Sequence, residues 1–232
     1  VLYDGMIAPV APLALTGALW YQGEANAAHA AQYRKLLPAM IGDWRKAFGQ
    51  GDFPFYIVSL ASFMPHRDAP GDDAWAELRE AQDFTAHTVA NSGLAVAIDL
   101  GDANDIHPKD KKEVGERLAL LALAKHYGKN IISAGPKFMV AEKIPGALRL
   151  RFDQKLTVKG DKPGDFAIAG DDKQWHWAEA RIEGDTVLVS SPEVPEPTAA
   201  RYAWQSNPKA TIFNAAGLPA VPFRTDIPLV TP

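Results

Sequence analysis

The first 130 residues alternate short apolar runs with longer amphipathic segments, and this alternation is the feature that most constrains the fold. Buried strands are predicted for the apolar runs at residues 16–21, 54–61 and 94–100. Helices are predicted for the segments at residues 31–48, 74–89 and 109–127. Parallel strands need helical crossovers of this kind, and such helices cover both faces of a sheet. The sequence therefore predicts an α/β fold.

The pattern changes after Pro136. Residues 148–152 and 186–189 alternate apolar with polar side chains, and Gly, Pro and Asp recur at short intervals around them. Such alternation is typical of antiparallel strands joined by tight turns. We therefore expect two domains: a parallel-sheet domain at residues 1–135 and a small, β-sandwich-like all-β module at residues 136–232.

The composition argues against several classes of partner and chemistry. The 232 residues carry 24 Lys and Arg against 28 Asp and Glu, and this net charge of −4 argues against nucleic acid or membrane as a partner. The absence of cysteine rules out a disulfide framework, and no apolar run is long enough to span a bilayer. No metal-ligand spacing or phosphate-binding glycine loop is present, so no cofactor is predicted.

Polar residues gather where the third predicted strand ends. The loop that follows this strand holds Asp102, Asp105 and His107. A histidine acts as a general base when a carboxylate fixes its tautomer, and Asp105 or Asp102 could do so here. The alternative is that Asp105 only shapes the turn and that His107 lies exposed in solvent.

A second cluster, Gln22-Gly23-Glu24-Ala-Asn26, follows the first predicted strand. Glycine lets the backbone approach a ligand closely, and the amide of Asn26 could stabilise an oxyanion. Glu24 could be a catalytic carboxylate or a buried hydrogen-bonding hub. The alternative is a strand end whose polar residues cap the next helix. Because ligands bind at the carboxyl ends of parallel strands, both clusters are candidates for the functional site.

Three segments, in this order along the chain, resemble the sialate O-acetylesterase-like carbohydrate esterases of the SGNH hydrolase superfamily. They are Leu2-Tyr-Asp-Gly-Met-Ile-Ala-Pro, Gly17-Ala-Leu-Trp-Tyr-Gln-Gly-Glu-Ala-Asn and Asp99-Leu-Gly-Asp-Ala-Asn-Asp-Ile-His-Pro-Lys. The segment Leu78-Arg79-Glu-Ala-Gln82 and parts of residues 207–226 also fit the family's pattern. The resemblance covers nearly the whole chain and implies that residues 1–135 are the C-terminal portion of an SGNH-type hydrolase domain.

This resemblance implies a serine esterase that removes acetyl groups from sugars without a metal or an organic cofactor. It implies that His107 is the base and that Asp105 orients it. Glu24 competes for the orienting role, because a glutamate of this block is proposed as the acid in some related acetylesterases. Asn104 departs from the superfamily, which has an aspartate three residues before the histidine. The residues implied to line the oxyanion and substrate site are Gln22, Gly23, Asn26 and Arg79.

The nucleophilic serine of this family belongs to an early glycine- and serine-containing block, which the 232 residues do not contain. The serines that are present lack that context: Ser59, Ser62, Ser92, Ser133, Ser190, Ser191 and Ser206. The chain also begins with Val1 rather than an initiator methionine. We therefore expect a C-terminal portion of a longer protein, whose serine-bearing N-terminal segment completes the site.

The expected substrate is an acetylated sugar or oligosaccharide, with sialic acid or a plant polysaccharide carrying the ester. The resemblance also implies a periplasmic or secreted protein. The alternative function is a non-catalytic carbohydrate-binding or scaffolding protein. Four aromatic residues of the second module could then stack on sugars, although core packing is the competing role for most of them: Trp175, Trp177, Tyr202 and Trp204.

Overall fold

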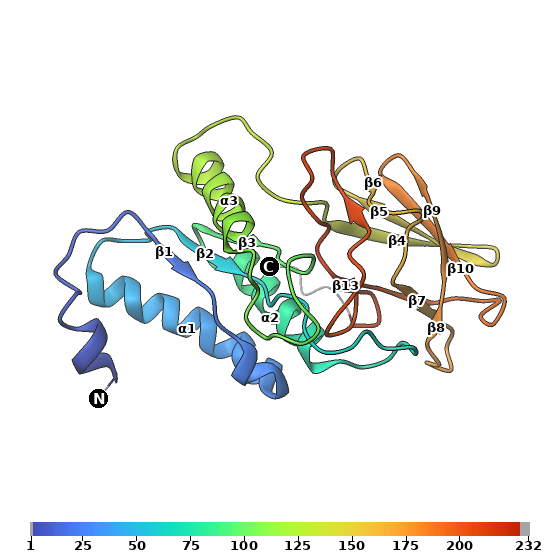
Figure 1. The fold of residues 1–232 in the computed structure, drawn as a ribbon, viewed down its shortest axis with the longest axis horizontal. Coiled ribbons are helices and arrows are strands. Elements are labelled where there is room, and N and C mark those ends of the chain that lie inside the picture. The colour runs from blue at the N-terminus through green and yellow to red at the C-terminus, as the bar shows by residue number, and fades with distance from the viewer. Residues whose placement is uncertain (1, 228–232) are drawn as a thin grey trace.

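The computed structural model describes residues 2–227, and its elements follow the two sequence patterns in turn (Figure 1). The strands and helices of the first part are β1 (Ala18–Trp20), α1 (Ala30–Phe48), β2 (Phe55–Val58), α2 (Ala74–Thr88), β3 (Ser92–Ala95) and α3 (Lys111–Leu121). Short π-helices span Tyr3–Ile7 and Ala122–His126, and a 3₁₀-helix spans Glu24–His29. None of the helices in residues 2–227 is long and apolar enough to cross a membrane.

The first three strands form a parallel sheet in the order β1-β2-β3. Trp20 lies beside Ile57, and Ile57 lies beside Leu94, with all three strands running in the same direction. The carboxyl ends of all three strands therefore lie at the same end of the sheet, which we call its carboxyl edge. The prediction of a parallel sheet within an α/β fold is confirmed.

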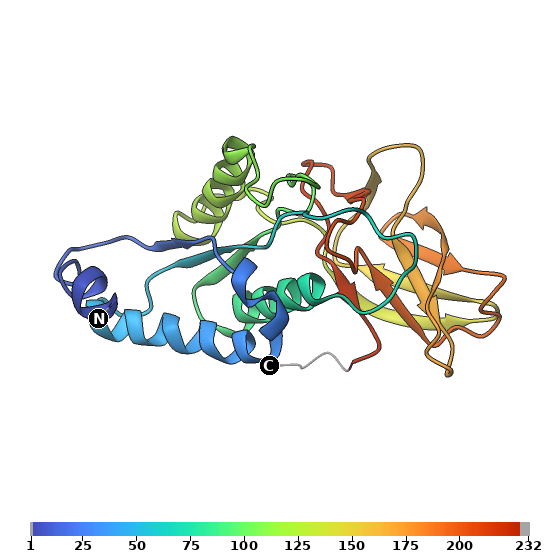
Figure 2. The same cartoon turned by 60° about the horizontal axis from the view of Figure 1, so that its bottom comes forward.

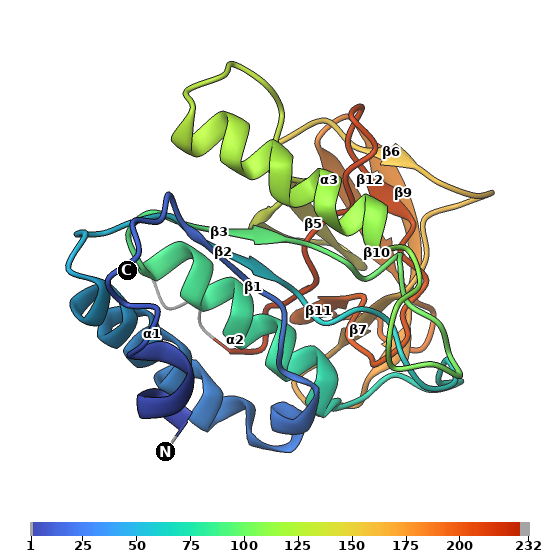
Figure 3. The same cartoon turned by 60° about the vertical axis from the view of Figure 1, so that its left-hand side comes forward.

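Helices cover both faces of this sheet because successive β2 side chains point in opposite directions. Phe55 and Ile57 belong to the hydrophobic cluster that α1 and α2 build on one face. Tyr56 and Val58 point the other way and pack in the cluster that Leu118 of α3 completes. Figure 3 shows the sheet between α3 on one side and α1 with α2 on the other.

Several element boundaries differ from those predicted, and two of the differences have a clear cause. β3 ends at Ala95, because the side-chain oxygen of Ser59 accepts the N–H of Ala97 at 3.0 Å and takes it out of the strand pairing. The third helix begins two residues late, at Lys111, because the carboxylate of Asp110 accepts the N–H of Glu113 at 3.0 Å as an N-cap.

Strand β4 and those that follow it pair antiparallel, as predicted. One sheet has the order β4-β5-β10-β9, formed by Phe138–Ile144, Ala147–Phe152, Thr186–Ser190 and Glu179–Glu183. A second has the order β13-β11-β7-β8, formed by Phe223–Arg224, Ala199–Tyr202, Phe166–Ala169 and His176–Trp177. β12 (Ile212–Phe213) pairs with β6 (Thr157–Val158).

These antiparallel strands lie at one end of the parallel sheet, and the loop between β2 and α2 reaches toward them (Figure 2). The main hydrophobic cluster is continuous across the two parts, since it contains Phe55 of β2 as well as Phe152 and Phe166 of the antiparallel sheets. A division into domains at residue 135 therefore stays a prediction. Packing holds the antiparallel part against the edge where the candidate site lies.

Candidate active site

The loop between β3 and α3 is shaped by two aspartate side chains. Asp102 Oδ1 accepts the N–H of Asn104 at 2.8 Å, and Asp105 Oδ1 accepts the N–H of His107 at 2.9 Å. Each is an Asx turn, in which a side chain replaces a backbone acceptor. The two aspartates also face each other across a short antiparallel bridge. Asp105 therefore shapes this turn, as the alternative interpretation of the loop expects.

The same Asp105 oxygen also faces the imidazole of His107. Oδ1 lies 3.6 Å from Nδ1, while the His107 side chain is 87% exposed. The backbone N–H of His107 lowers the pKa of the Asp105 carboxyl, and the positive charge of Lys109 lowers it further. A charged carboxylate at this position favours the tautomer that carries its proton on Nδ1 and leaves Nε2 free to accept one. The same carboxylate can therefore shape the turn and face the imidazole of His107.

A close approach between two loops fixes the backbone ahead of His107. A Cβ atom added to Gly101 would lie 1.9 Å from the carbonyl oxygen of Ser62, so only glycine fits at this point. The hydroxyl of Ser62 donates to the carbonyl of Ile98, and the N–H of Met64 donates to the carbonyl of Ala103 at 3.1 Å. The loop after β2 thus holds the loop after β3.

Arg117 of α3 anchors the same loop from its other side. Its guanidinium donates to both carboxylate oxygens of Asp99, at 2.6 and 2.7 Å, and to Glu113 at 3.1 Å. Burial lowers the pKa of Arg117, but the bonds to Asp99 and Glu113 outweigh burial, and the net change is upward. The charged, bidentate pair therefore joins the loop after β3 to the helix that follows His107.

The cluster after β1 is held by side chains of α1 and α2. The carbonyl of Gln22 accepts the hydroxyl of Tyr33 at 3.1 Å and the amide of Gln82 at 3.0 Å. The side-chain amide of Gln22 donates to Asn26 Oδ1 at 2.8 Å. This bond orients the amide of Asn26 and, among the residues that the structure describes, leaves its Nδ2 donors free for a ligand.

Gly23 lies where no larger residue fits. Its φ is +154°, and an added Cβ would lie 2.7 Å from Leu78 Cδ2. The next residue, Glu24, begins the 3₁₀-helix. Burial raises the pKa of Tyr21 to about 12, and the Glu24 carboxylate adds to the rise. The charge of Glu24 therefore acts on Tyr21, which lies three residues earlier in the same segment.

The sheet order separates the two candidate acids. β2 lies between β1 and β3, so the strand ends that carry Glu24 and His107 are not neighbours. Two strand spacings amount to about 10 Å. Asp105, by contrast, belongs to the same loop as His107 and lies within 3.6 Å of it.

Arg79 lies in a different environment from the one that the resemblance implied. It is 2% exposed, and burial lowers its pKa while the Asp73 carboxylate opposes that change. Its guanidinium donates to backbone carbonyls of the loop after β2 and of the antiparallel part, at 2.7–2.8 Å: Leu60, Ala61, Gln205 and Ser206. This geometry corrects the expectation of a substrate contact, because four buried carbonyls already occupy the side chain.

Two serines near the carboxyl edge of the sheet have structural partners. Ser59 accepts the N–H of Ala97, and Ser62 donates to the carbonyl of Ile98. Both are almost completely buried.

Within residues 2–227, no three His, Asp or Glu side chains are placed to hold a metal ion.

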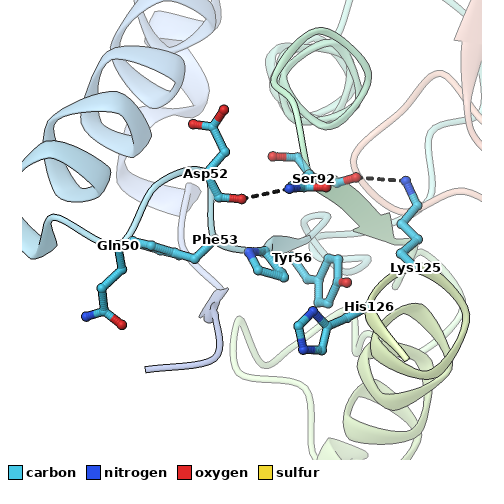
Figure 4. A pocket seen from close by; sticks show the side chains of 9 residues that line it. Gln50, Asp52, Phe53, Tyr56, Ser92, Lys125 and His126 are labelled. Atoms are coloured by element: carbon cyan, nitrogen blue, oxygen red, sulfur yellow. Dashed lines mark hydrogen bonds between the residues drawn. The ribbon is translucent and has the colours of Figure 1, made fainter. Parts of the chain in front are cut away.

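A cavity of about 550 Å³ lies at the opposite end of the strands (Figure 4). Tyr56 near the start of β2 and Ser92 at the start of β3 line it together with Lys125 and His126. Lys125 Nζ donates to the carbonyl of Ser92 at 2.8 Å, and burial lowers its pKa. This cavity opens away from both polar clusters and is not the candidate active site.

Two of the four aromatic residues considered for sugar stacking are core residues. Tyr202 is fully buried, and Trp204 is 5% exposed. Trp175 and Trp177 are only half-buried. The predicted competition between stacking and core packing is therefore resolved toward packing for Tyr202 and Trp204.

Sequence reasoning missed the anchoring role of Arg117, whose only sequence signal is an acidic residue four positions earlier on the same helix. It also missed a polar cluster in which His66 Nε2 lies 3.1 Å from Asp165 Oδ1. Gln205 donates to the second oxygen of this aspartate at 3.0 Å. These residues are distant in the sequence, and no local pattern connects them.

The whole fold is close to that of a solved protein. It superposes on the crystal structure of a carbohydrate acetylesterase from Xanthomonas citri with a TM-score of 0.91 and 42% sequence identity, over 97% of this chain and 54% of that one. The mixed α/β architecture, with its parallel and antiparallel sheets, is thus that of a carbohydrate esterase.

Sequence comparison gives the particular family. Residues 2–124 match the family model of carbohydrate esterases described as sialic acid-specific acetylesterases. The chain is 34% identical to the sialate O-acetylesterase of Mus musculus and 32% identical to that of Homo sapiens, over 98% and 96% of its length. The chain belongs to this carbohydrate esterase family, as the resemblance implied. It spans about half the length of these relatives, 47% and 48% respectively.

Proposed function

We propose that this chain carries the base, the orienting acid and part of the oxyanion site of a serine-dependent carbohydrate O-acetylesterase of the SGNH type. The observation that carries the proposal is the pairing of His107 Nδ1 with Asp105 Oδ1, at 3.6 Å, on the carboxyl edge of a parallel sheet. Membership in a carbohydrate esterase family supports this chemistry.

The serine is proposed to come from a segment that precedes this chain in the full-length protein. β1 forms one edge of the three-stranded sheet described here, and its Leu19 is 64% exposed. A further strand that paired in parallel with β1 would have its carboxyl end at the carboxyl edge, where Gln22 and His107 lie. That the chain covers only half of its relatives supports a partner of this kind.

In the acylation step, the serine Oγ attacks the acetyl carbonyl carbon while His107 Nε2 accepts the hydroxyl proton. The carbonyl π electrons move to oxygen and form an oxyanion, which the Nδ2 donors of Asn26 stabilise. Collapse of this intermediate breaks the bond between the acetyl carbon and the sugar oxygen. His107 returns its proton to that oxygen, and the sugar leaves as an alcohol.

Deacylation repeats the sequence with water as the nucleophile. His107 accepts a proton from water, the resulting hydroxide attacks the acetyl-enzyme, and acetic acid leaves as His107 returns its proton to the serine oxygen; the released acid then loses its proton to solvent as acetate. Asp105 stabilises the imidazolium in both steps, because its carboxylate is already charged and in place. Glu24 is the competing acid, and the sheet order makes it the weaker candidate.

The proposed substrate is an acetylated sugar or oligosaccharide, with sialic acid and plant polysaccharides as the two candidate classes. The relatives named sialate O-acetylesterase support the first class, and the Xanthomonas carbohydrate acetylesterase supports sugar esters in general. A periplasmic or secreted location is proposed on the family resemblance alone, and a compartment-specific reporter fusion tests it.

The decisive test compares Asp105→Asn with Glu24→Gln in the full-length protein, by measuring kcat on a small aryl acetate. We expect Asp105→Asn to lower kcat by about 10⁴, because the amide no longer stabilises the imidazolium. Glu24→Gln should lower it by about tenfold or less, because β2 separates Glu24 from the base. Near-normal activity of Asp105→Asn with collapse of Glu24→Gln would move the orienting role to Glu24.

A further inference from the structure

A second cavity, of about 750 Å³, lies where the loop before α2 meets the antiparallel sheet β13-β11-β7-β8. Its lining includes Asp72, Glu77, Trp175, Arg201, Arg224 and Asp226. Cavities of this volume hold small ligands in many proteins. None of these residues takes part in the proposed hydrolysis.

The wall of this cavity is a rigid stack of aromatic and guanidinium groups. Arg201 lies 4.0 Å from the Trp175 ring centre and 5.7 Å from that of Trp204, and Arg224 lies 4.6 Å from the latter. Asp226 holds Arg201 through two hydrogen bonds, at 2.7 and 3.1 Å. Glu80 holds Arg224 in the same bidentate way. The wall is therefore ordered before any ligand binds.

One donor of this wall has no partner among the residues that the structure describes. Arg201 is 3% exposed, and its Nη1 makes no hydrogen bond within residues 2–227. Its Nε and Nη2 bind Asp226, and Nη2 also lies 3.0 Å from Asp72. A buried N–H without an acceptor is unfavourable, so the pairing of Nε and Nη2 with carboxylates must offset this cost and hold the Arg201 side chain in place.

The charges around the cavity favour a neutral ligand. Its lining carries four carboxylates, those of Asp72, Glu77, Asp171 and Asp226, against three cations, those of Lys173, Arg201 and Arg224. This excess of negative charge would repel a carboxylate or a phosphate. Paired carboxylates nevertheless keep free lone pairs, which can accept hydrogen bonds from hydroxyl groups.

We propose that this cavity is a binding site for uncharged carbohydrate. The half-buried Trp175 supplies an apolar surface for a sugar ring. Carboxylates such as Glu77 accept hydrogen bonds from the sugar hydroxyl groups. The site goes beyond the proposed hydrolysis, because its binding needs neither His107 nor an acetyl group.

One loop contacts both the cavity and the candidate active site. The loop between β2 and α2 contributes Gly71 and Asp72 to the cavity, and Met64 of the same loop bonds to Ala103 of the His107 loop. A glycan held in the cavity would therefore lie on the element that borders the candidate catalytic edge. This placement suits a chain that processes sugar esters on longer glycans.

Calorimetry and saturation-transfer NMR on the full-length protein test the proposal with unacetylated, uncharged probes: xylohexaose, cellohexaose, galactotetraose and N-acetylchitohexaose. Sialyllactose is the charged comparison. Trp175→Ala should weaken binding of the best neutral probe by about tenfold or more, or about 1.4 kcal/mol. Asp171→Asn, at an exposed lining position, tests the same site with little risk to folding and should weaken binding several-fold.

The matched control is Trp177→Ala. Trp177 is also half-buried and lies two residues further on, but its indole N–H donates to the carbonyl of Asp68 at 2.6 Å and the ring does not line this cavity. Binding that survives this change and weakens in Trp175→Ala and Asp171→Asn supports the site. Failure of every neutral probe to bind at millimolar concentration, or tighter binding of sialyllactose, overturns the proposal. Hydrolysis of a small aryl acetate should stay unchanged in Trp175→Ala, so this test is independent of the proposed esterase.

Discussion

The two strand ends that carry the candidate active site are supported in different ways. After β1, side chains of Tyr33 and Gln82 reach from α1 and α2 to hold the carbonyl of Gln22. After β3, the close contacts reach the backbone, since Gly101 packs on Ser62, whereas the His107 side chain stays 87% exposed and faces Asp105 at 3.6 Å. The cluster after β1 is therefore the fixed end, because its side-chain amides are held as well as its backbone. In the loop after β3, the backbone is held closely, but the His107 side chain is not.

This difference matches the proposed roles. An oxyanion donor gains most from being oriented before the reaction, because it then stabilises developing charge without reorganising. A base must instead meet a nucleophile, and in this protein the serine is proposed to come from another segment. The open side of His107 is therefore where that segment would complete the site.

The largest expected effect comes from His107→Ala in the full-length protein. Loss of the base should lower kcat on an aryl acetate by about 10⁴–10⁶, because no other group on this edge lies in the same position. His29→Ala, on the exposed end of the 3₁₀-helix, is the matched control and should keep normal activity. Substantial activity in His107→Ala would refute the mechanism proposed here.

A smaller effect is expected from the fixed end. Asn26→Ala should lower kcat by about 10²–10³, the usual cost of removing one oxyanion donor, with little change in KM. Gln22→Ala removes the 2.8 Å bond to Asn26 Oδ1 and leaves the Asn26 donor in place. We expect an intermediate loss in that variant. Equal kcat in wild type and Asn26→Ala would show that this amide does not face the oxyanion.

The free energy of unfolding tests the backbone support of the loop after β3. Gly101→Ala should destabilise the protein by about 2–4 kcal/mol, because its Cβ would lie 1.9 Å from a backbone oxygen and the backbone would have to move. The control is Gly115→Ala on α3, where an added Cβ meets no atom within 4 Å. That change should stabilise the helix by about 0.5–1 kcal/mol. Denaturant unfolding measures both, and a neutral Gly101→Ala would contradict the packing of the two loops.

Much of this arrangement follows from the sequence, but the supporting contacts do not. Periodicity located β1, β2 and the helices, and the polar residues after β1 and β3 marked the right edge of the sheet. The sequence did not reveal that Ser59 removes Ala97 from β3, because that bond joins residues 38 positions apart. Arg79 was misjudged for the same reason, since its carbonyl partners at Gln205 and Ser206 are more than 120 residues away.

The smallest expected effect concerns the charge of Asp105 and the stability of the fold. The backbone N–H of His107 lowers the folded-state pKa of this carboxyl below its usual value. The folded state therefore binds fewer protons than the unfolded state near that value, so the charge contributes stability above about pH 5. This contribution is lost as the pH falls through the lowered pKa. Asp105→Asn keeps an oxygen for the turn but has no charge to titrate.

Unfolding of the wild type and Asp105→Asn by denaturant, measured between about pH 3 and pH 6, checks this linkage. The stability difference in favour of the wild type should be constant at the upper end and shrink toward the lower end. It should remain small, because both the carboxylate and the imidazole are exposed to solvent and screened by it. A difference that stays constant across the range would mean that the N–H of His107 does not favour the charged carboxylate. The turn would then hold His107 by shape alone, although Asp105 would still be charged near neutral pH and could still face the imidazole.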